Sequence, residues 1–406
     1  MLKGVVLAAG LGSRLNPLTA TRPKHLLPIA GKPILEHIIV ALKEAGVEEI
    51  GVVVHYFKEK IAELLGSGEK YGVKITYIEQ GGAKGTAHAI MAAKNYVGSE
   101  IFVVVYGDVT ARASVIREAL KLHEEVGAAA TMVSVEVEDP WNYGVLSIDE
   151  NGLLVRVVEK PKRGEEPSNL INAGIYVLDG SKVFQQIERT PISPRGEIEF
   201  TDTLQLLVNR DEKVAVLRTS REWWFDIGRP WDLLDANKAL LKELAEREGW
   251  MGGVKVDASA KIEDEVELVP PVVIGRGCVV KRRSVIGPNT VLCSGVTVGV
   301  NCKIENTIIL SRSNIGNSCK ISHSIVGGDC VVESDVEFRS WNPDGSNIFM
   351  TIKGVRVDSG RKKMGSVVGD YSFIGRGAVI APGTSIFPWS VVPRRMLVFS
   401  DVHYAP

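Results

Sequence analysis

The feature that most constrains this chain is an aliphatic residue at every sixth position in its C-terminal third. The series opens without a break at nine positions: Ile262, Leu268, Ile274, Val280, Ile286, Leu292, Val298, Ile304 and Leu310. After a one-residue slip it continues and, beyond an interruption, resumes at these positions: Ile315, Ile321, Val368, Ile374, Ile380, Ile386 and Val392. At ~3.3 Å per residue, six residues with one inward side chain make one flat side of a coil. The period predicts a parallel β-helix, with a loop leaving the coil within 337–365.

A different hydrophobic pattern precedes the coil. Short β-branched runs alternate with helical patterns, which predicts an α/β domain with a Rossmann-like, mixed but mostly parallel sheet. The expected strands are 5–7, 52–54, 101–105, 144–147, 174–177 and 214–217, and the expected helices are 33–45, 58–65 and 231–248. We predict two domains, 1–250 and 251–406.

Charge and composition exclude several classes of protein. The 48 basic and 49 acidic residues nearly cancel, so no summed field favours nucleic acid or an anionic membrane. The chain lacks an apolar run of ~18 residues and a signal-peptide layout, so we expect a cytoplasmic protein without a membrane segment. Its 5 cysteines form no C-x-x-C pair, which argues against disulfides and structural zinc.

A glycine-rich segment follows the first expected strand. It reads Leu7-Ala8-Ala9-Gly10-Leu11-Gly12-Ser13-Arg14-Leu15, and Arg22-Pro23-Lys24 comes soon after. Glycines allow backbone N–H groups to approach phosphate oxygens, and Arg and Lys add charged contacts. Two glycines alone also fit an ordinary strand-to-helix turn, because the third glycine of a dinucleotide-binding fingerprint and a Walker sequence are both missing.

The wider pattern resembles the sugar-1-phosphate nucleotidylyltransferases. Their signature is similar to L-A-A-G-x-G-x-R-L followed by P-K-x-L-L-P-I-x-G-K-P in this chain. Further motifs follow in the family's order: Gln80, Gly85-Thr86-Ala87-His88-Ala89, Tyr106-Gly107-Asp108, Tyr143-Gly144-Val145, Glu159-Lys160-Pro161, Asn172-Ala173-Gly174 and Trp224-Phe225-Asp226-Ile227-Gly228.

The resemblance implies a role for each matching residue. The catalytic set would be Arg14, Lys24, Asp108 and Asp226, of which the two aspartates would share a Mg²⁺ ion. The nucleotide-binding set would be Leu7, Ala8, Ala9, Gly10, Gly12, Gln80, Gly85 and Thr86. The sugar-phosphate-binding set would be Gly144, Glu159, Lys160 and Asn172. These roles suit phosphoryl-type transfer, in which positioning and charge compensation supply most of the catalysis.

The implied reaction is an in-line displacement that joins a sugar 1-phosphate to a nucleoside triphosphate and releases pyrophosphate. The Gly85-Thr86-x-His88-Ala89 pattern resembles the uridylyl branch, so UTP or dTTP is favoured, with glucose 1-phosphate or N-acetylglucosamine 1-phosphate as the sugar. The alternative is a mannose-1-phosphate guanylyltransferase, because that branch shares Thr21-Arg22-Pro23-Lys24. A catalytically inactive regulatory subunit is a rival interpretation, but the catalytic residues are all present.

The coil resembles the left-handed β-helix of archaeal bifunctional nucleotidylyltransferase/acetyltransferases. That resemblance makes His323 a possible general base for acetylating an amino-sugar 1-phosphate with acetyl-CoA. The segment 339–342 and Val326 depart from the acetyltransferase pattern, whereas the segment 359–365 resembles it. Acetyl transfer, alone or as a second activity, therefore stays open. Repeat coils also favour self-association, so we expect a homo-oligomer, with a trimer favoured.

Overall fold

The computed structural model describes residues 1–82 and 84–404, which form two compact units. The first unit comprises Met1–Leu11 and Ile34–Asp226, and the second comprises Gly12–Pro33 and the chain from Ile227 onward. Each unit thus takes two separate stretches of the chain. The domain boundary expected at residues 250 and 251 stays a prediction.

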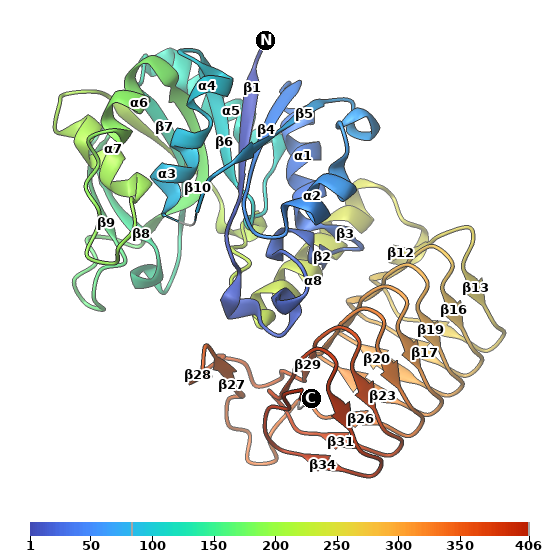
Figure 1. The fold of residues 1–406 in the computed structure, drawn as a ribbon. Helices are drawn as coiled ribbons and strands as arrows, with labels where there is room; N and C mark the ends of the chain where they lie inside the picture. Colours follow the sequence, from blue (N-terminus) through green and yellow to red (C-terminus); the bar gives the residue numbers. More distant parts are fainter. Residues whose placement is uncertain (83, 405–406) are drawn as a thin grey trace. The chain divides into compact units, whose positions relative to one another are not determined.

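A mixed sheet forms the centre of the first unit (Figure 1). Its strand order is β11-β7-β10-β6-β1-β4-β5, and β8 and β9 extend it from β10. Strands β6, β1, β4 and β5 are parallel, whereas β10 runs antiparallel to β6 and β7. The bounds are β1 Lys3–Ala8, β4 Glu49–Val54, β5 Lys74–Glu79, β6 Ile101–Tyr106, β7 Ala130–Glu136, β8 Gly144–Ile148, β9 Leu154–Glu159, β10 Leu170–Asp179 and β11 Val214–Arg218. The predicted α/β class is confirmed.

Helices of the first unit bury one apolar face each. In α1 the buried residues Leu35, Ile38, Ile39 and Leu42 recur at helical spacing. The bounds are α1 Ile34–Glu44, α2 Lys58–Leu65, α3 Thr86–Ala92, α4 Lys94–Val97, α5 Ala113–Val126, α6 Gly180–Ile187 and α7 Phe200–Val208, with short turns η4 Glu69–Tyr71, η5 Pro140–Asn142 and η6 Arg221–Trp223. Among the described residues, no helix combines the length and the hydropathy needed to cross a bilayer.

The second unit holds several short elements and one long helix, α8, before its coil. These are η1 Ser13–Leu15, η2 Leu18–Ala20, η3 Lys24–Leu26, β2 Pro28–Ile29, β3 Lys32–Pro33, α8 Pro230–Arg247 and η7 Met251–Gly253. Asn237 of α8 is buried and its Oδ1 accepts a hydrogen bond from the Ala30 N–H at 2.8 Å, which holds the β2–β3 hairpin on the helix. The predicted helix at 231–248 is confirmed.

The coil is a left-handed parallel β-helix whose three faces are seven-stranded parallel ladders, visible as stacked rungs in Figure 1. The first face holds β12 Val254–Val256, β15 Val272–Ile274, β18 Thr290–Leu292, β21 Ile308–Ile309, β24 Ile325–Val326, β29 Val367–Val368 and β32 Ser385–Ile386. The second face holds β13 Lys261–Ile262, β16 Val279–Val280, β19 Thr297–Val298, β22 Asn314–Ile315, β25 Val331–Val332, β30 Phe373–Ile374 and β33 Val391–Val392. The third face holds β14 Glu267–Leu268, β17 Val285–Ile286, β20 Lys303–Glu305, β23 Lys320–Ser322, β26 Glu337–Phe338, β31 Val379–Ile380 and β34 Leu397–Val398.

Two details of the predicted period were wrong. Leu292 pairs with Ile309 in the ladder, so Ile309 and not Leu310 is the residue that continues the series into the core. The beat also does not stop at Ile321, since Val326, Val332 and Phe338 follow it in the core. The two slips are five-residue steps, one from Ile304 to Ile309 and one from Ile321 to Val326.

The predicted loop is confirmed. The chain leaves the coil after β26 and re-enters at β29, which pairs directly with β24. The intervening residues form an antiparallel hairpin of β27 Phe349–Ile352 and β28 Val355–Asp358, which extends away from the rungs (Figure 1).

Candidate functional site

The carboxyl ends of the parallel strands place several predicted nucleotide-binding residues at one edge of the first unit's sheet. Leu7 of β1 lies beside Tyr106 of β6, and the Gly107 N–H donates to the Leu7 carbonyl at 2.9 Å. The segment Ala8–Gly10 therefore leaves the sheet next to Asp108. Ligands of open α/β sheets bind at this edge.

Asp108 and Asp226 are brought together by backbone pairing, although 118 residues separate them. Val109, the residue after Asp108, forms an isolated antiparallel bridge with Asp226. On the next residue, the Thr110 N–H donates to the Phe225 carbonyl at 3.0 Å and the Phe225 N–H donates to Thr110 Oγ1 at 2.8 Å. Both aspartates are half-buried.

This pair fits a magnesium ion by its donor set. Carboxylate oxygens suit Mg²⁺, which is commonly held by one or two carboxylates and keeps several waters or substrate oxygens. Within the described residues, no cluster of three or more His, Cys, Asp or Glu side chains is arranged to hold a metal. A two-carboxylate site is therefore consistent with an ion that the substrate phosphates would help to coordinate.

Four of the sequence motifs interlock behind the aspartate pair. The buried Trp224 indole donates to the Ala173 carbonyl at 2.8 Å and meets the Tyr143 ring edge-on at 5.7 Å between centroids. Gly174 has a φ of +75°, and a Cβ at this position would lie 2.8 Å from the Tyr106 ring. The motifs that contain Asp226, Asn172, Gly144 and Asp108 therefore pack as one cluster.

The residues expected to read the base also form one group. Gln80 is 7% exposed, and its Nε2 donates to the Gly85 carbonyl at 3.2 Å and lies 3.3 Å from His88 Nδ1. Thr86 Oγ1 accepts from the Phe200 N–H at 2.9 Å. Burial, followed by the charge of Lys84, lowers the pKa of His88, so the ring beside Gln80 is neutral at pH 7.

The four expected sugar-phosphate residues converge on Gly144. A Cβ there would lie 2.9 Å from Thr201 Cγ2, 3.0 Å from Glu159 Oε2 and 3.7 Å from the Asn172 Cβ, so glycine gives these side chains room. Lys160 has a φ of +47°, its N–H donates to the Tyr143 carbonyl at 2.9 Å, and its Nζ lies 3.7 Å from Glu159 Oε1. The four residues predicted from the sequence are thus neighbours in the structure.

A cavity of about 880 Å³ opens beside Glu159 and Lys160. Its lining includes Arg195, whose guanidinium contacts Glu159 at 3.3 Å and also pairs with Glu199. Burial lowers the pKa of Arg195, but its hydrogen bond to Glu199 and the charge of Glu159 outweigh burial and raise it overall. Burial, followed by the charges of Glu199 and Glu159, raises the pKa of Asp202 in the same wall.

Arg195 and Glu199 line the same cavity as Glu159 and Lys160, and neither was predicted from the sequence. A local signal was available, because three carboxylates and an arginine occur within 195–202, directly before and at the start of the apolar helix α7. The hydrogen-bonded chain from the Asn172 amide through the Tyr176 hydroxyl to the Tyr106 hydroxyl was not predicted either. Burial raises the pKa of both tyrosines, so these hydroxyls stay protonated.

The second unit holds Gly12, Arg14 and Lys24. Gly12 has a φ of +66°, and a Cβ there would lie 2.9 Å from the Lys24 Cβ, so the glycine allows the loop to pack on the lysine. A Cβ on Gly228 would lie 2.9 Å from Arg14 Nη2. The glycine that ends the Trp224–Gly228 motif therefore gives room for the Arg14 guanidinium of the signature.

His323 lies on the coil with a φ of +50° and its Nδ1 is buried without a hydrogen-bond partner. The returning insertion packs there, since the Gly365 N–H donates to the His323 carbonyl at 2.8 Å. Val326 is fully buried in the coil core and Trp341 is exposed at the start of the insertion.

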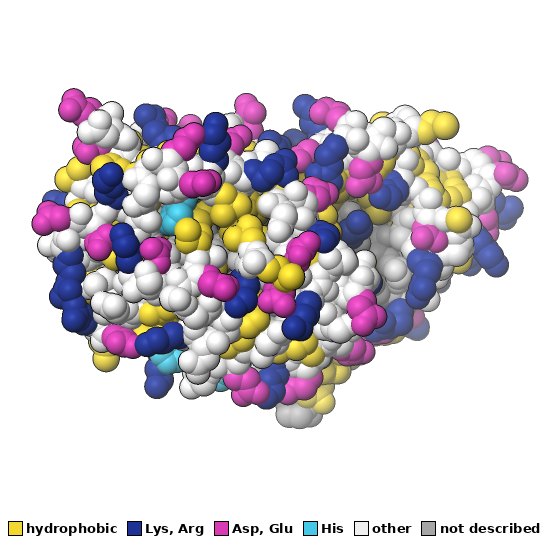
Figure 2. Space-filling model, turned by 90° about the horizontal axis from the view of Figure 1, so that it is seen from above, with side chains coloured by type: hydrophobic (Ala, Val, Ile, Leu, Met, Phe, Trp, Pro, Cys, Tyr) yellow, Lys and Arg dark blue, Asp and Glu magenta, His cyan; other side chains and the backbone are white. Residues whose placement is uncertain are grey.

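Charge is dispersed over the surface that Figure 2 shows, where basic and acidic side chains alternate. This agrees with the formal net charge of −1. Affinity for a polyphosphate would then come from the local groups described above and not from a field summed over the molecule.

Both parts of the chain match known protein families. Residues 3–243 match the family described as "Nucleotidyl transferase", and residues 268–397 match the "GMPPB C-terminal domain". The "Bifunctional protein GlmU" of Methanocaldococcus jannaschii is 36% identical, covering 95% of this chain and 92% of the relative. The "Bifunctional sugar-1-phosphate nucleotidylyltransferase/acetyltransferase" of Sulfurisphaera tokodaii is 32% identical, covering 99% of this chain and 98% of the relative.

A solved structure resembles the chain as well. A "Putative Glucose-1-Phosphate Thymidylyltransferase" from Bacillus anthracis superposes with a TM-score of 0.53 at 33% identity, covering 58% of this chain and 94% of that one. Because the first family match spans more than half of the chain and the two bifunctional relatives match over nearly their whole lengths, this protein belongs to the nucleotidyl transferase family and is a sugar-1-phosphate nucleotidyltransferase with a C-terminal β-helix.

Proposed function

We propose that the enzyme transfers a uridylyl or thymidylyl group to glucose 1-phosphate or N-acetylglucosamine 1-phosphate. The observation that carries the proposal is the backbone bridge between Val109 and Asp226, which gives the transfer a carboxylate pair at the sheet edge. Gln80 and the Gly85-Thr86 backbone are the groups proposed to read a pyrimidine edge, and they lie together because Gln80 Nε2 donates to the Gly85 carbonyl. Lys160 and Arg195 supply cations for the sugar phosphate.

In the proposed reaction, a phosphate oxygen of the sugar 1-phosphate attacks the α-phosphorus of the nucleotide. The new P–O bond forms as the bond from the α-phosphorus to the bridging oxygen breaks, and pyrophosphate leaves with that electron pair. A bound Mg²⁺ would neutralise phosphate charge, with Asp108 and Asp226 as its protein ligands. Arg14 and Lys24 hold the triphosphate by charge, and Lys160 orients the attacking phosphate. No side-chain proton transfer is required.

The guanylyl alternative is kept for the test. The match to the "GMPPB C-terminal domain" covers residues 268–397, which are coil residues, so it does not bear on the base-reading group in the first unit. The decisive experiment measures pyrophosphate release over a matrix of four nucleoside triphosphates and several sugar 1-phosphates. Release with UTP or dTTP supports the proposal, and release confined to GTP with mannose 1-phosphate contradicts it.

Acetyl transfer is a second candidate function, favoured by the acetyltransferase activity named for the Sulfurisphaera tokodaii relative and by the buried, unpartnered Nδ1 of His323. A neutral imidazole at that position could accept a proton from a sugar amine, with acetyl-CoA as donor. The test is the release of free coenzyme A from acetyl-CoA and glucosamine 1-phosphate without nucleotide. Activity that His323→Asn abolishes supports the candidate, and no release by the unaltered enzyme rejects it.

We also propose a homo-oligomer, with a trimer favoured, associated through the coil. Its support is an apolar strip on the second face, where Val331, Phe373 and Val391 are in register and Val331 and Val391 are exposed. The exposed rings of Tyr371 and Trp389 stack beside it at 5.6 Å. Sedimentation analysis of the full chain and of Val391→Lys tests this proposal, because a monomeric unaltered protein would contradict it.

A further inference from the structure

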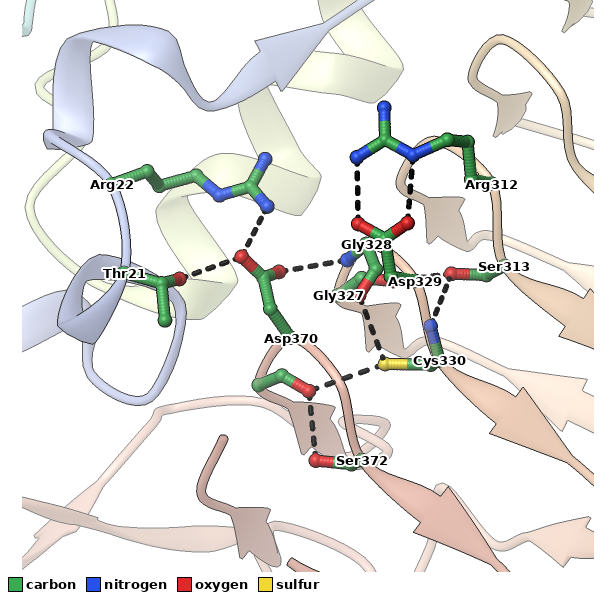
Figure 3. Close-up of polar contacts among 11 residues, drawn as sticks. Thr21, Arg22, Arg312, Ser313, Gly327, Gly328, Asp329, Cys330, Asp370 and Ser372 are labelled. Atoms are coloured by element: carbon green, nitrogen blue, oxygen red, sulfur yellow. Dashed lines mark hydrogen bonds and ion pairs between the residues drawn. The ribbon is translucent and has the colours of Figure 1, made fainter. Parts of the chain in front are cut away.

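A buried aspartate of the coil contacts the segment that precedes Lys24 (Figure 3). Asp370 lies in the turn between β29 and β30 and is 3% exposed. Its Oδ2 accepts a hydrogen bond from Thr21 Oγ1 at 2.6 Å and forms an ion pair with Arg22 Nη2. Its Oδ1 accepts from the Gly328 N–H at 2.7 Å. One carboxylate thus joins two turns of the coil to residues 21 and 22, all within the second unit.

The coil provides space for this contact. A Cβ on Gly328 would lie 3.2 Å from Arg22 Nη2, and a Cβ on Gly327 would lie 2.8 Å from Asp370 Oδ1. Two adjacent glycines therefore stand where the carboxylate and the guanidinium approach the backbone. A larger residue at either position would push against the ion pair.

Burying the Asp370 carboxylate costs free energy unless other groups compensate its charge. A carboxylate removed from water is tolerated when hydrogen bonds and an opposite charge compensate it, and removing one partner leaves the other charge buried and unpaired. Asp370 receives two hydrogen bonds from neutral donors and one charged contact. The positions of Thr21 and Arg22 relative to the coil are consequently well defined.

The constraint continues to Lys24. Pro23 has a φ of −68° and precedes η3, in which the Leu27 N–H donates to the Lys24 carbonyl at 3.0 Å. From the other side, Gly12 packs on the Lys24 Cβ. The Lys24 backbone is therefore held on one side by Arg22, two residues upstream, which contacts Asp370, and on the other side by Gly12.

We propose that Asp370 is a positioning residue for nucleotidyl transfer: by holding Thr21 and Arg22, the β-helix fixes Lys24 and the adjoining segment 12–15 in the geometry that binds the triphosphate. The proposal rests on the proposed function, which gives Lys24 its role. The coil then contributes to nucleotidyl transfer by positioning Lys24, in addition to any acetyl transfer or oligomer contact of its own.

The test compares Asp370→Asn with a matched control, Asp329→Asn. Asp329 is a neighbouring coil aspartate that pairs with Arg312 through two contacts of 2.7 Å, is more exposed, and has no drawn contact with Thr21 or Arg22 (Figure 3). Hydrogen–deuterium exchange of residues 13–27 in the full-length protein measures the anchoring without any need for activity. We expect faster exchange in Asp370→Asn and unchanged exchange in Asp329→Asn.

Kinetics then separate positioning from general destabilisation. Because misplacement of a reacting group by ~1 Å can cost up to ~100-fold, we expect Asp370→Asn to lower kcat/KM for the nucleotide by about 10- to 100-fold. The same change should have little further effect in a Lys24→Ala background, since it acts through that lysine. Thr21→Val, which removes one donor and keeps the side-chain shape, should give a smaller loss and replaces Asp370→Asn if that variant does not fold.

Wild-type exchange together with wild-type kcat/KM in Asp370→Asn would overturn the proposal. So would losses of Asp370→Asn and Lys24→Ala that multiply in the double variant, because independent effects multiply. If the unaltered enzyme releases no pyrophosphate in the substrate matrix, the proposed function fails, and with it the catalytic part of the inference. The exchange result then still decides whether Asp370 anchors the segment.

Discussion

The first unit and the coil use their buried residues in different ways. In the coil, each face is a ladder of two- or three-residue strands, and one inward aliphatic residue in about six builds the core. In the first unit, the core is drawn from strands and helices, and the candidate site lies where strands end. The repeat therefore specifies a scaffold, whereas the candidate site uses residues at strand ends that follow no repeating pattern.

The comparison predicts that a core substitution in the coil affects stability and not chemistry. Ile304 is fully buried in the coil core, and Ile304→Ala should lower the free energy of unfolding by about 2–5 kcal/mol through lost burial and the cavity left behind. Urea unfolding measures this, with Lys303→Ala on the exposed neighbouring position as the control. Turnover at 25 °C in the folded variant should stay near the original value, and a large loss of turnover would blur the distinction.

Substitutions at the carboxylate pair should instead lower turnover and leave stability nearly unchanged. Asp108→Asn and Asp226→Asn keep the size of each side chain and remove one ligand charge, so turnover should fall at least ~100-fold while the melting temperature changes little. Initial rates of pyrophosphate release measure the effect. Asp211→Asn, at an exposed position of the same unit, is the control. Near-normal turnover in both site variants would refute the metal assignment.

A smaller effect is expected at the sugar-phosphate end. Lys160→Gln removes the charge next to Glu159 and keeps much of the side chain, so KM for the sugar 1-phosphate should rise about 10-fold with kcat less affected. Steady-state kinetics at saturating nucleotide test this, with Lys121→Gln on α5 as the matched control. A variant with an unchanged KM and a reduced kcat would contradict a binding role.

The smallest effect concerns acid stability of the coil. Burial, followed by the charge of Lys363 and against that of Glu305, lowers the pKa of His323. As the pH falls through the ordinary histidine value of ~6.5, the unfolded chain takes up a proton that the folded ring resists, so folding stability is lost. His323→Asn should remove this contribution, which is less than about 1 kcal/mol because the ring is partly exposed. NMR titration that finds the His323 pKa at or above the ordinary value would contradict it.

Much of the scaffold could be predicted from the sequence because its signal is periodic. The six-residue beat identified the coil and its departing loop, yet it assigned Leu310 to the core where Ile309 belongs. The shortened side of the coil, five residues instead of six, contains the turn at Asn306, which has a φ of +49°. Where two aliphatic residues are adjacent, the spacing of hydrophobic residues does not show which of them points into the core. The continuation through Val326 to Phe338 was missed for the same reason.

The candidate site could be predicted from the sequence only at residues that belong to the family's motifs. Asp108 and Asp226 were named from resemblance, and the bridge that joins their neighbourhoods depends on pairing between distant segments. Arg195 and Asp370 belong to no motif that the sequence analysis quoted. Their partners, Glu159 and Arg22, are 36 and 348 residues away in the chain, and such contacts are identified by the folded structure.

The most direct test of the central claim, that a carboxylate-held magnesium ion supports nucleotidyl transfer at the first unit's sheet edge, is pyrophosphate release as a function of free Mg²⁺. The unaltered enzyme should be inactive in excess EDTA and regain full activity with added Mg²⁺, and Asp108→Asn and Asp226→Asn should need far more Mg²⁺ for half-maximal activity. Undiminished release in EDTA, or the same Mg²⁺ requirement in all three proteins, would contradict the account.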